Sequence, residues 1–292
     1  GVALSAKRLS CEATIVMPVT TPAIKVNAVR RLGGQVVLSG ESFSDAWQHT
    51  QDLIRQTGAI FIPPFEDPDV IAGQGTIGME ILRQHPDDLH AVFVPIGGGG
   101  LAAGVAAYIK LLRPEIRVIG VEPVDSNAMQ RSIEAGYPVE LKDVGLFADG
   151  VAVKQVGEET FAICRDMLDD IVTVDTDAIC AAVKDIFEDT RIVAEPAGAL
   201  SLAGLKAYVA RNGIREQSLI AIVSGANMNF DRLSYVVDRS ELGAEREALL
   251  AVTIPEEVGS FRHFVAAISN RNITELCTRS VDPVQARVLL GI

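Results

Sequence analysis

Four consecutive glycines at positions 97–100 separate an apolar segment from a segment with helical periodicity. Residues 91–96 are typical of a buried strand, and the Ala- and Leu-rich residues 101–112 are typical of a helix. Because glycine has no Cβ, the backbone N–H groups of such a loop can converge on a ligand. The unpaired N–H groups and positive dipole end of the following helix point to the same place. The sequence therefore predicts a phosphate-binding strand–loop–helix unit.

Strand and helix signals alternate along most of the chain. Apolar and β-branched runs typical of strands occupy residues 13–17, 35–38, 59–62, 91–96, 116–121, 171–174 and 218–223. Segments with helical periodicity occupy residues 22–32, 42–56, 69–84, 101–112, 126–135, 158–168, 176–190 and 196–211. Alternation at this spacing predicts an α/β fold, in which crossover helices cover both faces of parallel sheets.

The pattern changes after residue 229. A charged helix is expected at residues 231–247, followed by a strand at 248–254, a helix at 260–269, and strands at 273–278 and 287–292. This β-α-β-β order after a polar linker predicts the start of a separate small α+β domain. The sequence opens within an expected helix and stops within an expected strand, so we expect a fragment.

Composition argues against several classes of partner. The 292 residues carry a formal net charge of −12, which disfavours nucleic acid or an anionic membrane as a partner. No apolar run is long enough to cross a bilayer and no signal-peptide pattern begins the sequence, so we expect a cytoplasmic protein. The four cysteines and four histidines are dispersed without metal-ligand spacing, so we expect no metal site.

The glycine run is compatible with two kinds of ligand. Gly98-x-Gly100-x-x-Ala103 matches the dinucleotide fingerprint, and Glu122 follows at the expected distance of about 20 residues. A nicotinamide-dependent dehydrogenase is therefore the main alternative. Four unbroken glycines far along the chain, however, suit a compact terminal phosphomonoester better than a passing pyrophosphate.

Three further segments gain meaning only in combination. Ser224 follows an expected core strand, where its hydroxyl could hydrogen-bond a heteroaromatic nitrogen, although Ser-Gly after a strand is more often a simple turn. Glu195 precedes a helix that begins with proline, and interaction with the helix dipole explains it. Gly73 and Gly75 indicate either close helix packing or the approach of a ligand.

Six motif segments follow one another in order along the chain, at residues 63–68, 70–76, 94–104, 147–154, 194–199 and 224–227. Together they resemble the biosynthetic threonine deaminases (threonine ammonia-lyases) of the fold-type II pyridoxal-phosphate family. The resemblance implies two open, twisted, mostly parallel sheets with flanking helices, plus a partial ACT-like α+β domain. It implies a small cofactor domain at residues 1–57, a large cofactor domain at 58–240 and a partial regulatory domain at 241–292.

The resemblance also implies a cofactor and roles for particular residues. The cofactor is pyridoxal 5'-phosphate, whose phosphate would be held by Gly97, Gly98, Gly99, Gly100 and the N–H of Leu101. Ser224 would hydrogen-bond the pyridine nitrogen. A neutral hydroxyl at that position suits elimination of a β-hydroxyl better than transamination.

The reaction implied by the resemblance converts L-threonine to 2-oxobutanoate and ammonia, which is the committed step towards isoleucine. Serine stays open as a second substrate. The implied partners are isoleucine and valine, as opposing effectors of the ACT-like domain, and further copies of the chain in a homo-oligomer, which is a tetramer in the family.

In the resembling family, the Schiff-base lysine lies upstream of the position that Gly1 occupies, so no catalytic residue is assigned. Each lysine of this chain is interpreted as a surface or linker residue, including Lys154 within one of the six segments. We therefore expect the 292-residue chain to be inactive. A second alternative is a non-catalytic amino-acid-sensing protein built on a decayed catalytic domain.

Overall fold

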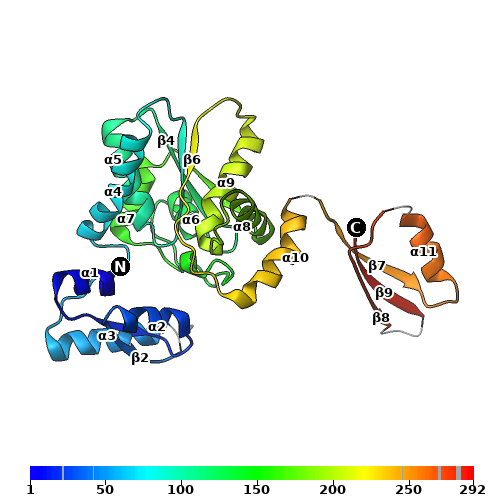
Figure 1. Cartoon of the computed structure of the whole chain (residues 1–292), viewed down its shortest axis with the longest axis horizontal. Coiled ribbons are helices and arrows are strands. Elements are labelled where there is room, and N and C mark those ends of the chain that lie inside the picture. Colours follow the sequence, from blue (N-terminus) through cyan, green and yellow to red (C-terminus); the bar gives the residue numbers. More distant parts are fainter. Residues whose placement is uncertain (22, 42, 245, 269–270, 281–283) are drawn as a thin grey trace. The chain divides into compact units, whose positions relative to one another are not determined.

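The computed structural model of the chain describes residues 1–21, 23–41, 43–244, 246–268, 271–280 and 284–292 (Figure 1). The chain divides into two compact units, Gly1–Pro63 and Pro64–Ile292, which we call the first and the second unit. Four residues of the expected helices lie outside the described residues: Pro22, Ser42, Glu245 and Ser269.

The first unit combines two parallel strands with three helices. Its elements are α1 (Val2–Leu9), β1 (Thr14–Met17), α2 (Ala23–Arg31), β2 (Gln35–Leu38) and α3 (Phe43–Thr57). β1 and β2 pair in parallel, and α2 makes the crossover that a parallel pair requires. The alternation predicted for residues 13–56 is confirmed.

The strand predicted at residues 59–62 is wrong. All four residues are described, and they form an irregular segment after α3. Ile60 is 88% exposed, and the ring of Phe61 packs edge-on against Trp47 of α3, with 4.9 Å between the ring centroids. The apolar side chains that suggested a strand thus meet solvent or a helix, and no neighbouring strand supports them.

The second unit is built on a four-stranded sheet. Its strands are β3 (Ala91–Pro95), β4 (Arg117–Pro123), β5 (Asp170–Val174) and β6 (Leu219–Ala221), in the order β5-β4-β3-β6. Each neighbouring pair is parallel, as the alternating pattern predicts. The carboxyl ends of all four strands therefore share one edge of the sheet.

Helices cover both faces of this sheet (Figure 1). They are α4 (Pro68–Gln84), α5 (Gly100–Leu112), α6 (Ala128–Ala135), α7 (Glu158–Met167), α8 (Thr176–Thr190) and α9 (Pro196–Asn212). Successive residues of β3 enter two different cores: Phe93 packs with residues of α8 and α9, and Val92 packs with residues of α4, α5 and α7. β3 is buried on both faces, which explains its unbroken apolar sequence.

The strand order creates a topological switch point between β3 and β6. From β3 the chain passes to β4 and β5 on one side, and it returns to β6 on the other side. Open α/β sheets bind ligands at the carboxyl edge where the order reverses in this way. The glycine run follows β3 and Ser224 follows β6, so the two predicted binding elements flank this point.

The charged helix predicted at residues 231–247 is shorter than expected. It consists of a 3-10 turn, η2 (Phe230–Arg232), and α10 (Leu233–Gly243). Beyond α10, the N–H of Arg246 donates to the carbonyl of Glu241 at 2.9 Å, five residues back. This wider turn ends the helical hydrogen-bond pattern.

The last part of the chain forms a small antiparallel sheet in the order β7-β9-β8. Its elements are β7 (Leu249–Pro255), α11 (Ser260–Ile268), β8 (Glu275–Ser280) and β9 (Gln285–Gly291). Alternate side chains of β9 are buried, as expected for a strand with one covered face. The predicted β-α-β-β order is confirmed.

No helix in the described parts of the chain is both long and apolar enough to cross a membrane. Within the same residues, no three His, Cys, Asp or Glu side chains gather closely enough to hold a metal ion. The cysteines are free thiols, with Cys164 and Cys180 buried and Cys11 and Cys277 exposed.

Candidate functional site

The glycine run forms the turn between β3 and α5. Gly99 directly precedes α5 and has a φ of 97°, a left-handed conformation that favours glycine. Among the described residues, no group accepts a hydrogen bond from the backbone N–H groups of positions 97–101. Such a cluster of unpaired N–H groups at a helix N-terminus can bind an anion such as a phosphate.

Close packing is a second reason for glycine at these positions. A Cβ on Gly97 would lie 3.0 Å from the Cα of Val151, and one on Gly100 would lie 3.0 Å from the Cβ of Phe65. A Cβ on Gly98 would overlap the Phe65 ring. The sequence suggested only ligand access as the reason for the glycine run. In the structure, the surrounding protein also leaves no space for side chains on this loop.

Other glycines bring the motif segments into direct contact. A Cβ on Gly75 of α4 would lie 3.1 Å from the carbonyl oxygen of Gly104 in α5, so the segments at residues 70–76 and 94–104 meet there. A Cβ on Gly150 would lie 2.9 Å from the Cβ of Ala197, which joins two later segments. Of the two interpretations of Gly75, close helix packing is therefore the correct one.

Ser224 lies beyond the carboxyl end of β6, beside the start of α9. Its hydroxyl donates a long hydrogen bond of 3.4 Å to the carbonyl of Ala197. The N–H of Glu195 donates to the carbonyl of Gly225 at 3.1 Å, so the Ser-Gly turn is tied to the start of α9. Ser224 is exposed, and its hydroxyl can exchange this weak bond for one to a ligand.

Glu122 is not available as a ribose ligand. The residue is fully buried at the end of β4, and its two carboxylate oxygens accept hydrogen bonds of 2.9 Å from the N–H groups of Met129 and Gln130 in the first turn of α6. Burial raises the pKa of Glu122 to about 7, although these two hydrogen bonds oppose the shift. The acidic residue that the dinucleotide alternative required thus serves as a helix cap.

Replacing Glu122 with glutamine is expected to change how stability depends on pH. The folded-state pKa of about 7 exceeds the ordinary value of 4.5, so folding favours the protonated acid. The stability from this preference is present below the ordinary pKa and is lost as pH rises through the folded pKa. Relative to the Glu122→Gln variant, the wild type should lose unfolding free energy between about pH 4.5 and about pH 7.

Urea unfolding of the wild type and the variant across this pH range measures the difference in unfolding free energy. Taking the difference cancels the contribution of every other titrating group, because both proteins share those groups. A difference that stays constant with pH would show that Glu122 has an ordinary pKa. The glutamine amide, like the protonated acid, presents one donor group to the backbone N–H groups of α6, so the variant avoids the cost of burying a charge, which grows in the wild type as pH rises.

The lysines with contacts in the second unit are engaged away from the glycine loop. Lys110 pairs with Asp169 at 2.7 Å, and the ammonium of Lys154 donates to the carbonyl of Lys142 at 3.0 Å. Lys184 of α8 forms an ion pair with Glu241 of α10, and Lys206 of α9 forms one with Asp185 of α8. None of these contacts places an ammonium group at the loop.

Thr160 contacts the loop directly, although no sequence pattern predicted it. It lies in the first turn of α7, is fully buried, and donates from its hydroxyl to the carbonyl of Gly98 at 2.6 Å. The two residues are 62 positions apart, and a single threonine near a helix start carries no signal of such a contact. Only the packing of α7 beside α5 brings them together.

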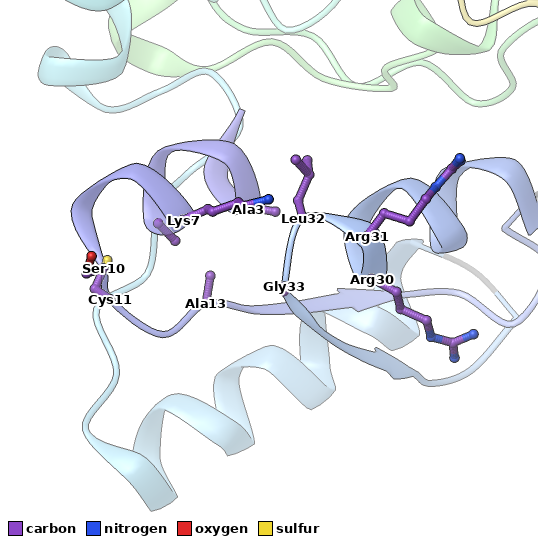
Figure 2. Close-up of a pocket in the computed structure, with 11 residues that line it drawn as sticks. Ala3, Lys7, Ser10, Cys11, Ala13, Arg30, Arg31, Leu32 and Gly33 are labelled. Atoms are coloured by element: carbon purple, nitrogen blue, oxygen red, sulfur yellow. The ribbon is translucent and has the colours of Figure 1, made fainter.

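The first unit contains a cavity of about 310 Å³ between α1 and the turn that joins α2 to β2 (Figure 2). Ala3, Cys11 and Leu32 are among its lining residues. Figure 2 shows the Arg30 and Arg31 side chains extending away from Ala3, so their charges do not converge on this space.

Comparison with known sequences identifies two matching families. The family described as pyridoxal-phosphate dependent enzyme matches residues 1–225, and the C-terminal regulatory domain of threonine dehydratase matches residues 238–292. The chain is 59% identical to the biosynthetic L-threonine dehydratase IlvA of Burkholderia multivorans and 55% identical to that of Escherichia coli. It is 53% identical to the chloroplastic biosynthetic threonine dehydratase 1 of Solanum lycopersicum.

Each of these alignments covers 100% of this chain, but only 58%, 57% and 48% of the respective relative. The chain therefore spans about half the length of the curated relatives it matches. Among solved structures, the processed form of threonine deaminase isoform 2 from Solanum lycopersicum superimposes with a TM-score of 0.81 at 50% identity, covering 82% of this chain and 66% of that one. Maize serine racemase superimposes with a TM-score of 0.75 at 34% identity, covering 84% and 74%.

Proposed function

The chain belongs to the family of pyridoxal-phosphate dependent enzymes, and on that premise we propose that it carries the cofactor-binding core of a threonine ammonia-lyase. The reaction converts L-threonine to 2-oxobutanoate and ammonia, the committed step towards isoleucine. One observation carries the proposal: the unpaired N–H groups of the glycine loop and the exposed Ser224 hydroxyl flank one switch point, at the carboxyl ends of neighbouring strands. The identity to threonine dehydratases supports the choice of reaction.

The residues present fit pyridoxal 5'-phosphate. The N–H groups of Gly97, Gly98, Gly99, Gly100 and Leu101 would hold the phosphate, because they lack protein acceptors among the described residues. The Ser224 hydroxyl would hydrogen-bond the pyridine nitrogen. When bound, the cofactor supplies an electron sink for the substrate carbon next to the carboxylate.

The neutral hydroxyl of Ser224 bears on the type of reaction. A hydroxyl can accept or donate at the pyridine nitrogen, whereas a carboxylate would hold that nitrogen protonated. A pyridine nitrogen that is less firmly protonated withdraws electrons less strongly. This favours loss of the β-hydroxyl over transamination. This applies equally to threonine and serine, so threonine is proposed from the relatives rather than from the site.

The remaining functional assignments extend the same proposal. Residues 1–57 would belong to a small cofactor domain, 58–240 to a large one and 241–292 to an ACT-like regulatory domain, which the match to a regulatory domain at residues 238–292 supports. Isoleucine and valine would act as opposing effectors of this domain, and the chain would assemble into a homo-oligomer. The cytoplasm is the proposed location, although the names of some plant relatives assign them to the chloroplast.

We also propose that the 292 residues, taken alone, do not turn over threonine. By the resemblance, the Schiff-base lysine would lie outside them, and the contacts that Lys110, Lys154, Lys184 and Lys206 make elsewhere support this. With that lysine outside these residues, they would lack the group that anchors the cofactor covalently and moves the proton.

The test measures 2-oxo acid release from L-threonine with added pyridoxal phosphate. The 292-residue chain should be slower by about 10²-fold or more than a chimera in which the upstream residues of the Burkholderia multivorans relative precede it. An inactive chimera that folds would contradict the proposed reaction and favour the amino-acid-sensing alternative. Turnover by the chain alone would contradict the assignment of the lysine.

A further inference from the structure

The carbonyl of Gly98 is held from the side of α7. The Thr160 hydroxyl donates to it at 2.6 Å and also lies 3.1 Å from the carbonyl of Gly157, the residue before α7. The N–H of Gly157 approaches the same Gly98 oxygen at 3.5 Å. Thr160 is fully buried, so no water competes for its hydroxyl.

This contact determines where the next N–H group points. The peptide bonds of the described residues are all trans, and in a trans peptide the C=O and the following N–H point in opposite directions. Since the Gly98 carbonyl points at Thr160, the N–H of Gly99 points away from α7. Among the described residues nothing accepts a hydrogen bond from that N–H.

The glycine run makes such a restraint necessary. Gly98 and Gly99 flank the peptide bond in question, and glycine adopts positive and negative φ about equally well. The Gly98–Gly99 peptide could therefore turn over at low cost and direct its carbonyl oxygen, which repels phosphate, into the site. The hydrogen bond from Thr160 opposes that rotation.

A second contact supports the same position. The Thr160 side chain lies directly against Gly99, since a Cβ on Gly99 would be 2.9 Å from the Cβ of Thr160. The thiol of Cys164, one turn further along α7, lies 3.9 Å from the Gly99 carbonyl. α7 thus contacts two successive peptides of the loop, and Thr160 makes the shorter hydrogen bond.

We infer that Thr160 is a positioning residue for phosphate recognition: it fixes the Gly98–Gly99 peptide so that the Gly99 N–H faces the ligand. The inference rests on the proposed function, because it assumes that the loop binds the phosphate of pyridoxal phosphate. Thr160 itself touches no ligand in this account, and its effect passes through the peptide bond.

The test compares calorimetric titrations of the 292-residue chain with pyridoxal phosphate and with pyridoxal, which lacks the phosphate. Thr160→Val removes the hydroxyl at nearly constant volume and should weaken pyridoxal phosphate binding by about tenfold, with pyridoxal binding unchanged. Thr160→Ser keeps the hydroxyl and should restore phosphate-dependent binding. Ser132→Ala is the control, because it removes an equally buried hydroxyl that donates to the Ala128 carbonyl at 2.6 Å within α6.

Equal binding of pyridoxal phosphate by the wild type and Thr160→Val would overturn the inference while leaving the proposed cofactor intact. A wild type that binds pyridoxal phosphate no better than pyridoxal would contradict the proposed function itself, and the inference with it. If Thr160→Val fails to fold, the amide resonance of Gly99 in the wild type decides the question. Inorganic phosphate should shift it strongly, and an unchanged resonance would overturn the inference.

Discussion

Replacing Gly104 with alanine is expected to lower the free energy of unfolding by about 3 kcal/mol or more, which is the largest loss of stability that we predict. A Cβ on Gly104 would overlap the carbonyl oxygen of Ile71 and lie 2.7 Å from the backbone N of Gly75. Both atoms belong to the backbone of α4, so no side chain can rotate to make room. The helices must separate, and the core that Val105 and Ile109 fill beside them would loosen.

Gly73→Ala is the matched control for this prediction. Gly73 lies in α4, the helix that Gly104 of α5 contacts, but outside its own chain neighbours and the α4 backbone no heavy atom of the described residues would lie within 4 Å of its Cβ. Alanine there removes only the entropic cost of glycine in a helix and should stabilise by about 0.5–1 kcal/mol. Urea unfolding measures both variants, and a similar effect of the two substitutions would contradict the close contact between α4 and α5.

Alanine at Gly99 is expected to weaken pyridoxal phosphate binding by about 100-fold or more. Two effects add: a φ of 97° is strained for any residue with a Cβ, at about 1–2 kcal/mol, and the new Cβ would lie 2.7 Å from the Cε of Met129. The same Cβ would also lie 2.9 Å from the Cβ of Thr160. The peptide must move, and the N–H groups that we propose bind the phosphate move with it.

Gly136→Ala separates the backbone strain from the loss of the site. Gly136 follows α6 with a φ of 84°, yet apart from its two chain neighbours no heavy atom of the described residues would lie within 4 Å of a Cβ at this position. This variant should lose stability from the positive φ alone and keep its affinity for pyridoxal phosphate, as measured by calorimetry. Equal affinity losses in the two variants would mean that Gly99 acts through general stability and not through the loop.

Sequence patterns predicted those parts of the fold that local chemistry determines. The strand at residues 91–96, the glycine turn and the helix that follows it form one continuous signal, and the structure reproduces it as β3, the loop and α5. The run at residues 59–62 has a similar apolar composition but forms no strand. Strand formation depends on a neighbouring strand, and Phe61 packs on Trp47 instead.

The candidate site was predictable only in part, for the same reason. Gly98 and Ser224 stand next to strands whose carboxyl ends can be read from the alternation of elements, so their common edge follows from topology. The capping role of Glu122 and the contact from Thr160 depend on how α6 and α7 pack. Spacing alone made Glu122 a plausible ribose ligand, and burial removed that possibility.

The central claim is that the glycine loop binds the phosphate of pyridoxal phosphate. The most direct measurement follows the backbone amide resonances of positions 97–101 in the isotope-labelled chain during separate titrations with pyridoxal phosphate and with NAD. We predict that pyridoxal phosphate shifts these resonances, that inorganic phosphate competes with it, and that NAD leaves them unchanged. Shifts caused by NAD, or binding of pyridoxal phosphate that leaves all of these amides unchanged, would contradict the account.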